Sequence, residues 1–389
     1  MRTGMWLVAV LGYVIQTKAI SHVYSLTDPE KQQSSSHQEA LCLLFAHLSA
    51  WTVMAPLTEL FSRLKSGSLG GNGPRFTEML PVTISAAVVT DEELFLDNDS
   101  LPRATGTLRT QLKRLLQVVV LASLLIVAGY TFLVALRLSP ALDVAMMHNT
   151  SMFEIVSLLL VVAGVAPRKH LVRNFALMVV ILAGIFIVSY TKATSDLLSG
   201  KLSVNESTGE LDDPFLFDRL KGALTCGLGA LTIGPFFVLW SKWSATAQTG
   251  PVDSIRPYLT HRERTRISNF EISQLGVMNL LILGPLLFFS GTNNLWAQCT
   301  WSKSAWILVS VFAGHLPMIW ALVNLSDRVS PQYASTCFVG AIVFMAAADC
   351  ISETTQIIVT RWEVIGYLMI SVAGLLLGRR YLSTAKTDS

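Results

Sequence analysis

Residues 117–136 read QVVVLASLLIVAGYTFLVAL and contain no charged side chain. The hydrocarbon core of a bilayer is ~30 Å thick, so a helix needs about 20 mostly apolar residues to cross it. A second stretch of the same kind, FALMVVILAGIFIVSY, occupies residues 175–190. Because lipid offers no hydrogen-bond partner to a bare backbone, we expect both stretches to cross a membrane as helices.

The composition of the whole chain agrees with this interpretation. Of its 389 residues, 52% are hydrophobic and only 14% are charged, whereas an average soluble protein is about 25% charged. The net charge of +3 is too small to indicate a nucleic-acid partner, and five cysteines give no even-numbered disulfide framework. The composition therefore predicts an all-α integral membrane protein with many spans.

Ten segments are long and apolar enough to span a bilayer. They are approximately Gly4–Tyr24, Ala40–Arg63, Arg114–Arg137, Ala141–Ala163, Leu171–Tyr190, Arg219–Trp240, Glu271–Ser290, Ser304–Leu325, Pro331–Ile351 and Trp362–Gly378. The first segment has an alternative interpretation as a signal peptide, because Arg2 precedes the apolar run Trp6–Ile15. We expect a retained helix, since the apolar character resumes after Lys18.

The distribution of basic residues predicts the orientation. Most Lys and Arg residues fall in cytosolic segments if the amino terminus is cytosolic, and an even number of spans then places both termini in the cytosol. The longest cytosolic loop covers about residues 64–113, and residues 191–218 form a lumenal or extracellular linker. Of the four glycosylation sequons, only the one at Asn205 is predicted to be accessible to a lumenal transferase.

The two halves of the chain show an internal repeat. Spans three to five align with spans eight to ten, which matches Leu138-Ser139 with Leu325-Ser326 and Ala183-Gly184 with Ala373-Gly374. Because each half has five spans, the halves must enter the membrane with opposite orientations. This predicts a 5+5 inverted-repeat bundle, although chance similarity between apolar helices is the alternative. The expected units are residues 1–190, the linker 191–218, residues 219–381 and a cytosolic tail, 382–389.

These features resemble the drug/metabolite transporter superfamily, and in particular its EamA-like and solute carrier family 35 (nucleotide-sugar-transporter-like) members. The resemblance depends on Leu138-Ser139 before a small-polar fourth helix, on the basic turn Arg168-Lys169, and on the Ala-Gly pair that ends each half. It implies ten helices, cytosolic termini, alternating access and an endomembrane location such as the vacuole or the Golgi/ER. The family's acidic residue before the basic turn is absent, because Ala166-Pro167 stands there.

Polar and ionisable groups at membrane depth are costly and are therefore candidates for function. Glu154 lies near the middle of the fourth span, on one helix face with Ser151. Lys18 is a candidate to pair with Glu154 or to bind an anionic substrate, and its alternative role is to reach the interface. The full set of candidate substrate-binding residues is Glu154, Lys18, His148, Asn149, Ser151, Ser335, Thr336, Gln274, Asn279 and His315. For each, a purely structural role in helix packing is the alternative.

Two functions follow as hypotheses. The first is a secondary transporter that moves a small polar metabolite by alternating access, with proton coupling through Glu154 as an option. The second is a non-transporting membrane scaffold or receptor with a transporter-like fold, for which the missing acidic residue and the long cytosolic loop are the evidence. No enzyme motif, metal-ligand cluster or cofactor motif is found in the sequence. The expected partners are a small-molecule substrate and the bilayer, with a homodimer left open and no nucleic acid.

Overall fold

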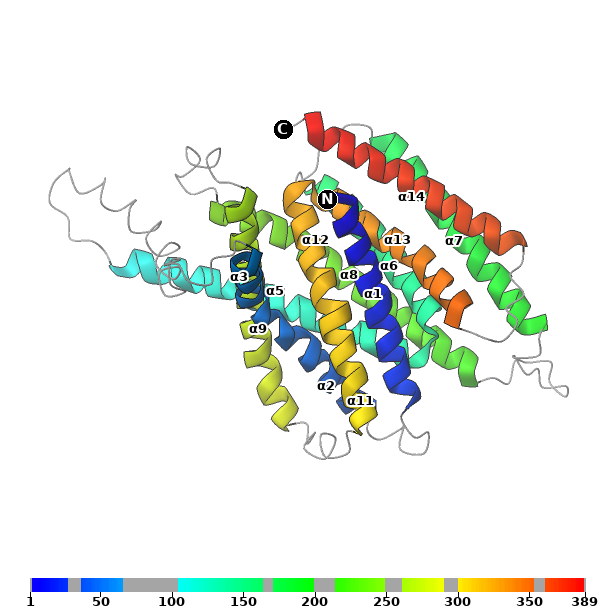
Figure 1. Ribbon diagram of the computed structural model, residues 1–389, viewed down its shortest axis with the longest axis horizontal. Helices are drawn as coiled ribbons and strands as arrows, with labels where there is room; N and C mark the ends of the chain where they lie inside the picture. Colours follow the sequence, from blue (N-terminus) through cyan, green and yellow to red (C-terminus); the bar gives the residue numbers. More distant parts are fainter. Residues whose placement is uncertain are drawn as a thin grey trace.

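The computed structural model describes residues 2–26, 36–65, 104–163, 171–198, 214–248, 261–289, 300–352 and 361–387. Every element in these ranges is helical (Figure 1). The elements are α1 (Arg2–Ser25), α2 (Ser36–Ser49), η2 (Ala50–Val53), α3 (Met54–Lys65), α5 (Ala104–Leu138), α6 (Ala141–Val162), α7 (Leu171–Leu198), α8 (Pro214–Gln248), α9 (His261–Phe289), α11 (Trp301–Leu308), η7 (Val309–His315), α12 (Leu316–Arg328), α13 (Pro331–Ser352) and α14 (Arg361–Thr387). Each of the ten predicted spans corresponds to a helix or to a run of consecutive helical elements, although α5 and α9 each begin ten residues before the predicted start.

The lengths and compositions of these helices confirm a multi-pass membrane protein. Within the described ranges, nine helical segments are long and apolar enough to cross a bilayer. The tenth predicted span, α7, has a shorter apolar stretch, Val172–Val188. The helix α5 begins inside the predicted loop 64–113, and α14 continues through most of the predicted tail. Hydropathy marks where lipid begins rather than where a helix ends, so polar helical turns extend beyond the apolar segments.

Two of the spans are interrupted by irregular turns. The second span consists of α2 and α3 joined by the 3₁₀ turn η2, and the eighth consists of α11 and α12 joined by the π-helical turn η7. Proline follows each interruption, at Pro56 and at Pro317, and proline cannot donate a hydrogen bond to the preceding turn. Ser273 of α9 accepts a hydrogen bond from the Ala55 N–H (2.8 Å) and donates one to the Trp51 carbonyl (3.2 Å). The break at η2 is therefore stabilised by a side chain from another helix.

Helix α1 packs between α12 and α13. It runs antiparallel to the eighth span: a Cβ atom placed on Gly314 would lie 2.7 Å from the backbone nitrogen of Gln16, and the ring of His22 near the end of α1 contacts Trp306 of α11. It runs parallel to α13, since Trp6 donates a hydrogen bond to Thr336 (3.2 Å) early in both helices. Figure 1 shows α1 and α12 side by side.

Helix α8 packs in the same way against α5 and α6. It is antiparallel to α5. Gly222 lies against Ser139, directly after the last residue of α5, whereas Gly229 lies against Thr131, about two turns earlier in α5. It is parallel to α6, where Cys226 lies 3.8 Å from the Val144 carbonyl oxygen.

Helices α7 and α14 form an antiparallel pair along one edge of the bundle (Figure 1). Glycines allow the two backbones to touch. A Cβ atom on Gly184 would lie 2.9 Å from the Gly366 carbonyl oxygen, and one on Gly366 would lie 2.7 Å from that of Gly184. Small residues at such contacts are a general feature of membrane helix packing.

Candidate functional site

A buried polar network joins three spans near the middle of the bundle. Trp51 of η2 donates its indole N–H to His315 Nε2 at 2.6 Å, and His315 Nδ1 lies 3.2 Å from the Gln16 side-chain oxygen. An indole nitrogen can only donate, so Nε2 of His315 is the acceptor and Nδ1 carries the hydrogen. His315 is therefore a neutral imidazole with both ring nitrogens hydrogen-bonded.

A second histidine completes this network. His47 Nδ1 lies 2.7 Å from the Leu43 carbonyl oxygen, and its Nε2 lies 2.8 Å from the Ser310 hydroxyl. A carbonyl oxygen can only accept, so Nδ1 of His47 carries a hydrogen and donates it to Leu43. The two imidazole rings lie edge to face, with centroids 5.2 Å apart. We name the five side chains Gln16, His47, Trp51, Ser310 and His315 the midplane network.

The irregular turns explain why these side chains meet. Ser310 and His315 both belong to the π turn η7, and both are buried. In a regular α-helix, side chains five positions apart point about 140° away from each other. Gly314 lets α1 approach closely enough for Gln16 to reach the turn. Of this network, His315 belongs to the predicted set of substrate-binding candidates. The signals for the others were the polar Gln16 in the first span and the Pro residues that mark the irregular turns.

Ser335 of α13 lies beside a part of α6 other than His148 and Asn149. Helices α6 and α13 do pack together, but the hydroxyl of Ser335 lies 3.5 Å from Ser157, near the far end of α6. The two helices run antiparallel, so positions that are equivalent in an inverted repeat lie at opposite depths.

His148 and Asn149 have other neighbours. Asn149 is fully buried with neither amide atom hydrogen-bonded, and the ring of His148 packs on Phe132 at a centroid distance of 4.8 Å. Thr336 accepts the hydrogen bond from Trp6. These side chains therefore fill contacts between helices.

The ammonium group of Lys18 forms an ion pair with Asp349 of α13, and the two side chains are 33% and 15% exposed. Because α1 and α13 run parallel, Lys18 and Asp349 reach the same depth. Lys18 therefore joins two helices, and the side chain of Glu154, its other predicted partner, lies outside what the structure describes.

The remaining candidates are dispersed. Gln274 is exposed on α9, whereas Asn279 of the same helix is fully buried, with neither amide atom hydrogen-bonded. The side chains of Glu154 and Ser151, like the whole of Asn205, lie outside what the structure describes.

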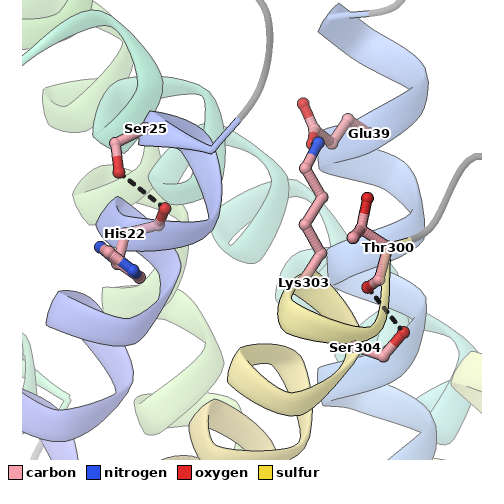
Figure 2. Close-up of polar contacts among 6 residues, drawn as sticks. All are labelled: His22, Ser25, Glu39, Thr300, Lys303 and Ser304. Atoms are coloured by element: carbon pink, nitrogen blue, oxygen red, sulfur yellow. Dashed lines mark hydrogen bonds and ion pairs between the residues drawn. The ribbon is translucent and has the colours of Figure 1, made fainter.

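Ion pairs hold helices together at both ends of the bundle. Figure 2 shows one end, where Lys303 Nζ of α11 lies 3.6 Å from Glu39 Oε1 of α2. Beside this pair, Ser304 donates a hydrogen bond to the Thr300 carbonyl at the start of α11. At the other end, Arg266 of α9 lies 3.2 Å from Glu59 of α3.

The polar interior is packed rather than open. Asn149 is 0% exposed, Ser335 is 2%, Thr336 is 4%, and His148 and His315 are each 7%. Among the described residues, no group of three or more His, Cys, Asp or Glu side chains could hold a metal ion. The arrangement provides helix-to-helix contacts.

Comparison with known proteins gives a consistent result over the full length. A family model described as ceramide synthase regulator (CSG2) matches residues 1–381. The mannosyl phosphorylinositol ceramide synthase regulatory protein CSG2 of Saccharomyces cerevisiae is 36% identical over 408 aligned residues, which cover 96% of this chain and 97% of the relative.

These matches correct three of the sequence-based expectations. The resemblance to the drug/metabolite transporter, EamA-like and solute carrier family 35 proteins is wrong, because the matching family is one of regulators. The expectations of a secondary transporter and of a small-molecule substrate are therefore also wrong. Apolar helices with small residues and scattered polar groups occur in many membrane proteins. A short pattern such as Leu-Ser or Ala-Gly therefore does not identify the transporter family. The expectation that the chain is not an enzyme agrees with the regulatory family.

The family model covers nearly the whole chain and the yeast relative aligns from end to end, so the chain belongs to the ceramide synthase regulator family.

Proposed function

We propose that this chain is a non-catalytic membrane subunit that binds a mannosyl phosphorylinositol ceramide synthase and regulates it. The observation that carries the proposal is the 36% identity to a regulatory protein of that synthase over 96% of this chain and 97% of the relative. Such similarity spans every helix of the bundle, so it is not confined to a shared module.

The packing of the bundle supports a scaffold. The midplane network uses both ring nitrogens of two histidines, the Lys18–Asp349 ion pair joins α1 to α13, and further ion pairs join helices at both ends. Interhelical polar contacts of this kind fix helices relative to one another within lipid. A bundle fixed in this way presents a constant outer surface to a membrane-embedded partner.

Co-purification tests the proposal directly. The tagged chain and the synthase are expressed together, extracted in a mild detergent, and purified on the tag and then by size exclusion. We expect the synthase to elute with the chain, and not with another multi-span membrane protein carrying the same tag. A synthase that never elutes with the chain, in any mild detergent that keeps the synthase active, contradicts the proposal.

We also propose that the bundle is a 5+5 inverted repeat with its halves at residues 1–190 and 219–381. The contact pattern supports this: the first span is antiparallel to the eighth and parallel to the ninth, and the sixth span is antiparallel to the third and parallel to the fourth. Exchanging the two halves turns one set of contacts into the other. The edge pair α7–α14 and the central pair α6–α13 are each mapped onto themselves by the same exchange.

The proposed topology keeps both termini in the cytosol and places the protein in an endomembrane. The excess of basic residues on the side of the termini supports the orientation. With this topology the linker 191–218 is lumenal and carries the sequon at Asn205, which is the proposed glycosylation site.

A further inference from the structure

An arginine cluster lies at one end of the edge pair formed by α7 and α14. Arg173 is the third residue of α7, and Arg379 and Arg380 lie in the last turns of α14. Arg380 donates a hydrogen bond to the Asn174 side-chain oxygen at 3.3 Å, which fixes the two helix ends beside each other. The charges of Arg173 and Arg380 are close enough to repel.

The charge of this cluster is not balanced within the two helices. The acidic residues of α7 and α14 are Asp196 and Glu363, and both belong to the opposite ends of these helices. Arg173 and Arg379 are exposed. Like charges held together raise the free energy of the folded state, and an anion placed between them lowers it.

The depth of the cluster indicates where such an anion comes from. The apolar stretch of α7 begins at Val172, and the uncharged run 364–378 of α14 ends directly before Arg379. The arginines therefore lie where the uncharged parts of both helices end, at the level expected for the headgroup layer. The amino-terminal turn of α7 adds the positive end of its helix dipole at the same level.

From this juxtaposition we infer that Arg173, Arg379 and Arg380 form a binding site for a phosphate group, carried by the headgroup of an anionic lipid in the leaflet on this side. Guanidinium groups match phosphate oxygens in shape and charge, and two of them on separate helices can bind one phosphate from both sides. A bound lipid phosphate would reduce the repulsion between Arg173 and Arg380 and so stabilise this end of the α7–α14 pair. Inorganic phosphate shares the chemistry and is the alternative source.

Direct titration of the purified full-length chain in detergent tests the inference. The probes are dioctanoyl phosphatidylinositol 4-phosphate, dioctanoyl phosphatidylcholine and inorganic phosphate, with binding followed by thermophoresis. A basic residue near a membrane surface contributes about 1 kcal/mol toward an anionic lipid, which is a factor of about five. We expect Arg173→Gln to weaken binding of the phosphoinositide about fivefold and R173Q/R379Q about 25-fold.

A control variant separates this site from general charge. Lys113→Gln removes an exposed positive charge from α5. We expect it to bind the phosphoinositide within twofold of the unchanged protein. The elution volume and thermal midpoint of R173Q show that it is folded.

The outcomes are distinct. If the unchanged protein binds the phosphoinositide but not inorganic phosphate, and R173Q loses that binding, the anion comes from a lipid. If the unchanged protein also binds inorganic phosphate and R173Q loses both to the same extent, the same site is filled by phosphate from solution. Equal affinity of R173Q and the unchanged protein for the phosphoinositide overturns the inference. Equal affinity of the unchanged protein for phosphatidylcholine and the phosphoinositide also overturns it.

Discussion

Replacing His315 by Phe tests whether the midplane network holds the bundle together. Phenylalanine keeps a ring between Trp51 and His47, whose ring centroids lie 5.9 Å and 5.2 Å from that of His315. It removes the hydrogen bonds to Trp51 and to Gln16, which leaves a buried indole N–H and a buried amide oxygen without partners. The perturbation is thus limited to two hydrogen bonds.

The expected magnitude follows from membrane proteins in general. Interhelical hydrogen bonds there contribute about 0.6 kcal/mol on average and about 1.7 kcal/mol at most. The 2.6 Å contact to Trp51 is short and both groups are buried, so we place the combined loss at about 1–3 kcal/mol. The free energy of unfolding is measured by titrating the purified protein with SDS in mixed micelles.

A matched control makes this measurement specific. His22 is an exposed histidine on α1 whose ring contacts Trp306, and His22→Phe is expected to change the free energy of unfolding by less than about 0.5 kcal/mol. Trp51→Phe added to H315F is expected to cost less than Trp51→Phe alone, since the stranded N–H disappears. If H315F and H22F are equally stable, the midplane network does not stabilise the bundle.

Three further predictions concern other contacts. The charge swap K18D/D349K is expected to recover most of the stability that Lys18→Met loses, as measured by thermal midpoint, because the ion pair is rebuilt in reverse; no recovery would show that the pair is not formed. Gly314→Ala places a methyl group 2.7 Å from a backbone nitrogen and is expected to cost about 1–3 kcal/mol, whereas Gly227→Ala meets nothing within 4 Å and is expected to cost nothing; equal effects would contradict the close helix approach. Asn205→Gln is expected to abolish a glycosidase-sensitive mass shift, and a shift that persists in this variant would contradict the proposed topology.

The fold was largely predictable because lipid imposes a simple rule. Stretches such as residues 117–136 must be helical, since an unpaired backbone in hydrocarbon costs several kcal/mol per group. The irregular turns η2 and η7 were not predicted, because a 3₁₀ or π turn leaves no signal in hydropathy. Their only local mark is a following proline, which also occurs in uninterrupted membrane helices such as α9.

The site was harder to predict than the fold. Burying a polar side chain in the membrane costs free energy, so residues such as Lys18 and His315 stand out in the sequence. The sequence does not show which residue pairs with each of them. The partner depends on relative helix direction: Lys18 meets Asp349 because α1 and α13 are parallel, and Ser335 meets Ser157 because α6 and α13 are antiparallel. The function depended on a comparison, because a packed polar interior is compatible with many roles in a membrane.

The activity of the synthase tests the central claim most directly. Purified synthase is reconstituted into liposomes with or without the full-length chain, and the rate at which it forms mannosyl phosphorylinositol ceramide is measured. The account predicts that adding the chain changes the rate severalfold, whereas an equal amount of an unrelated multi-span protein does not. An unchanged rate, in liposomes where the chain is shown to be folded and in excess, would contradict a regulatory role.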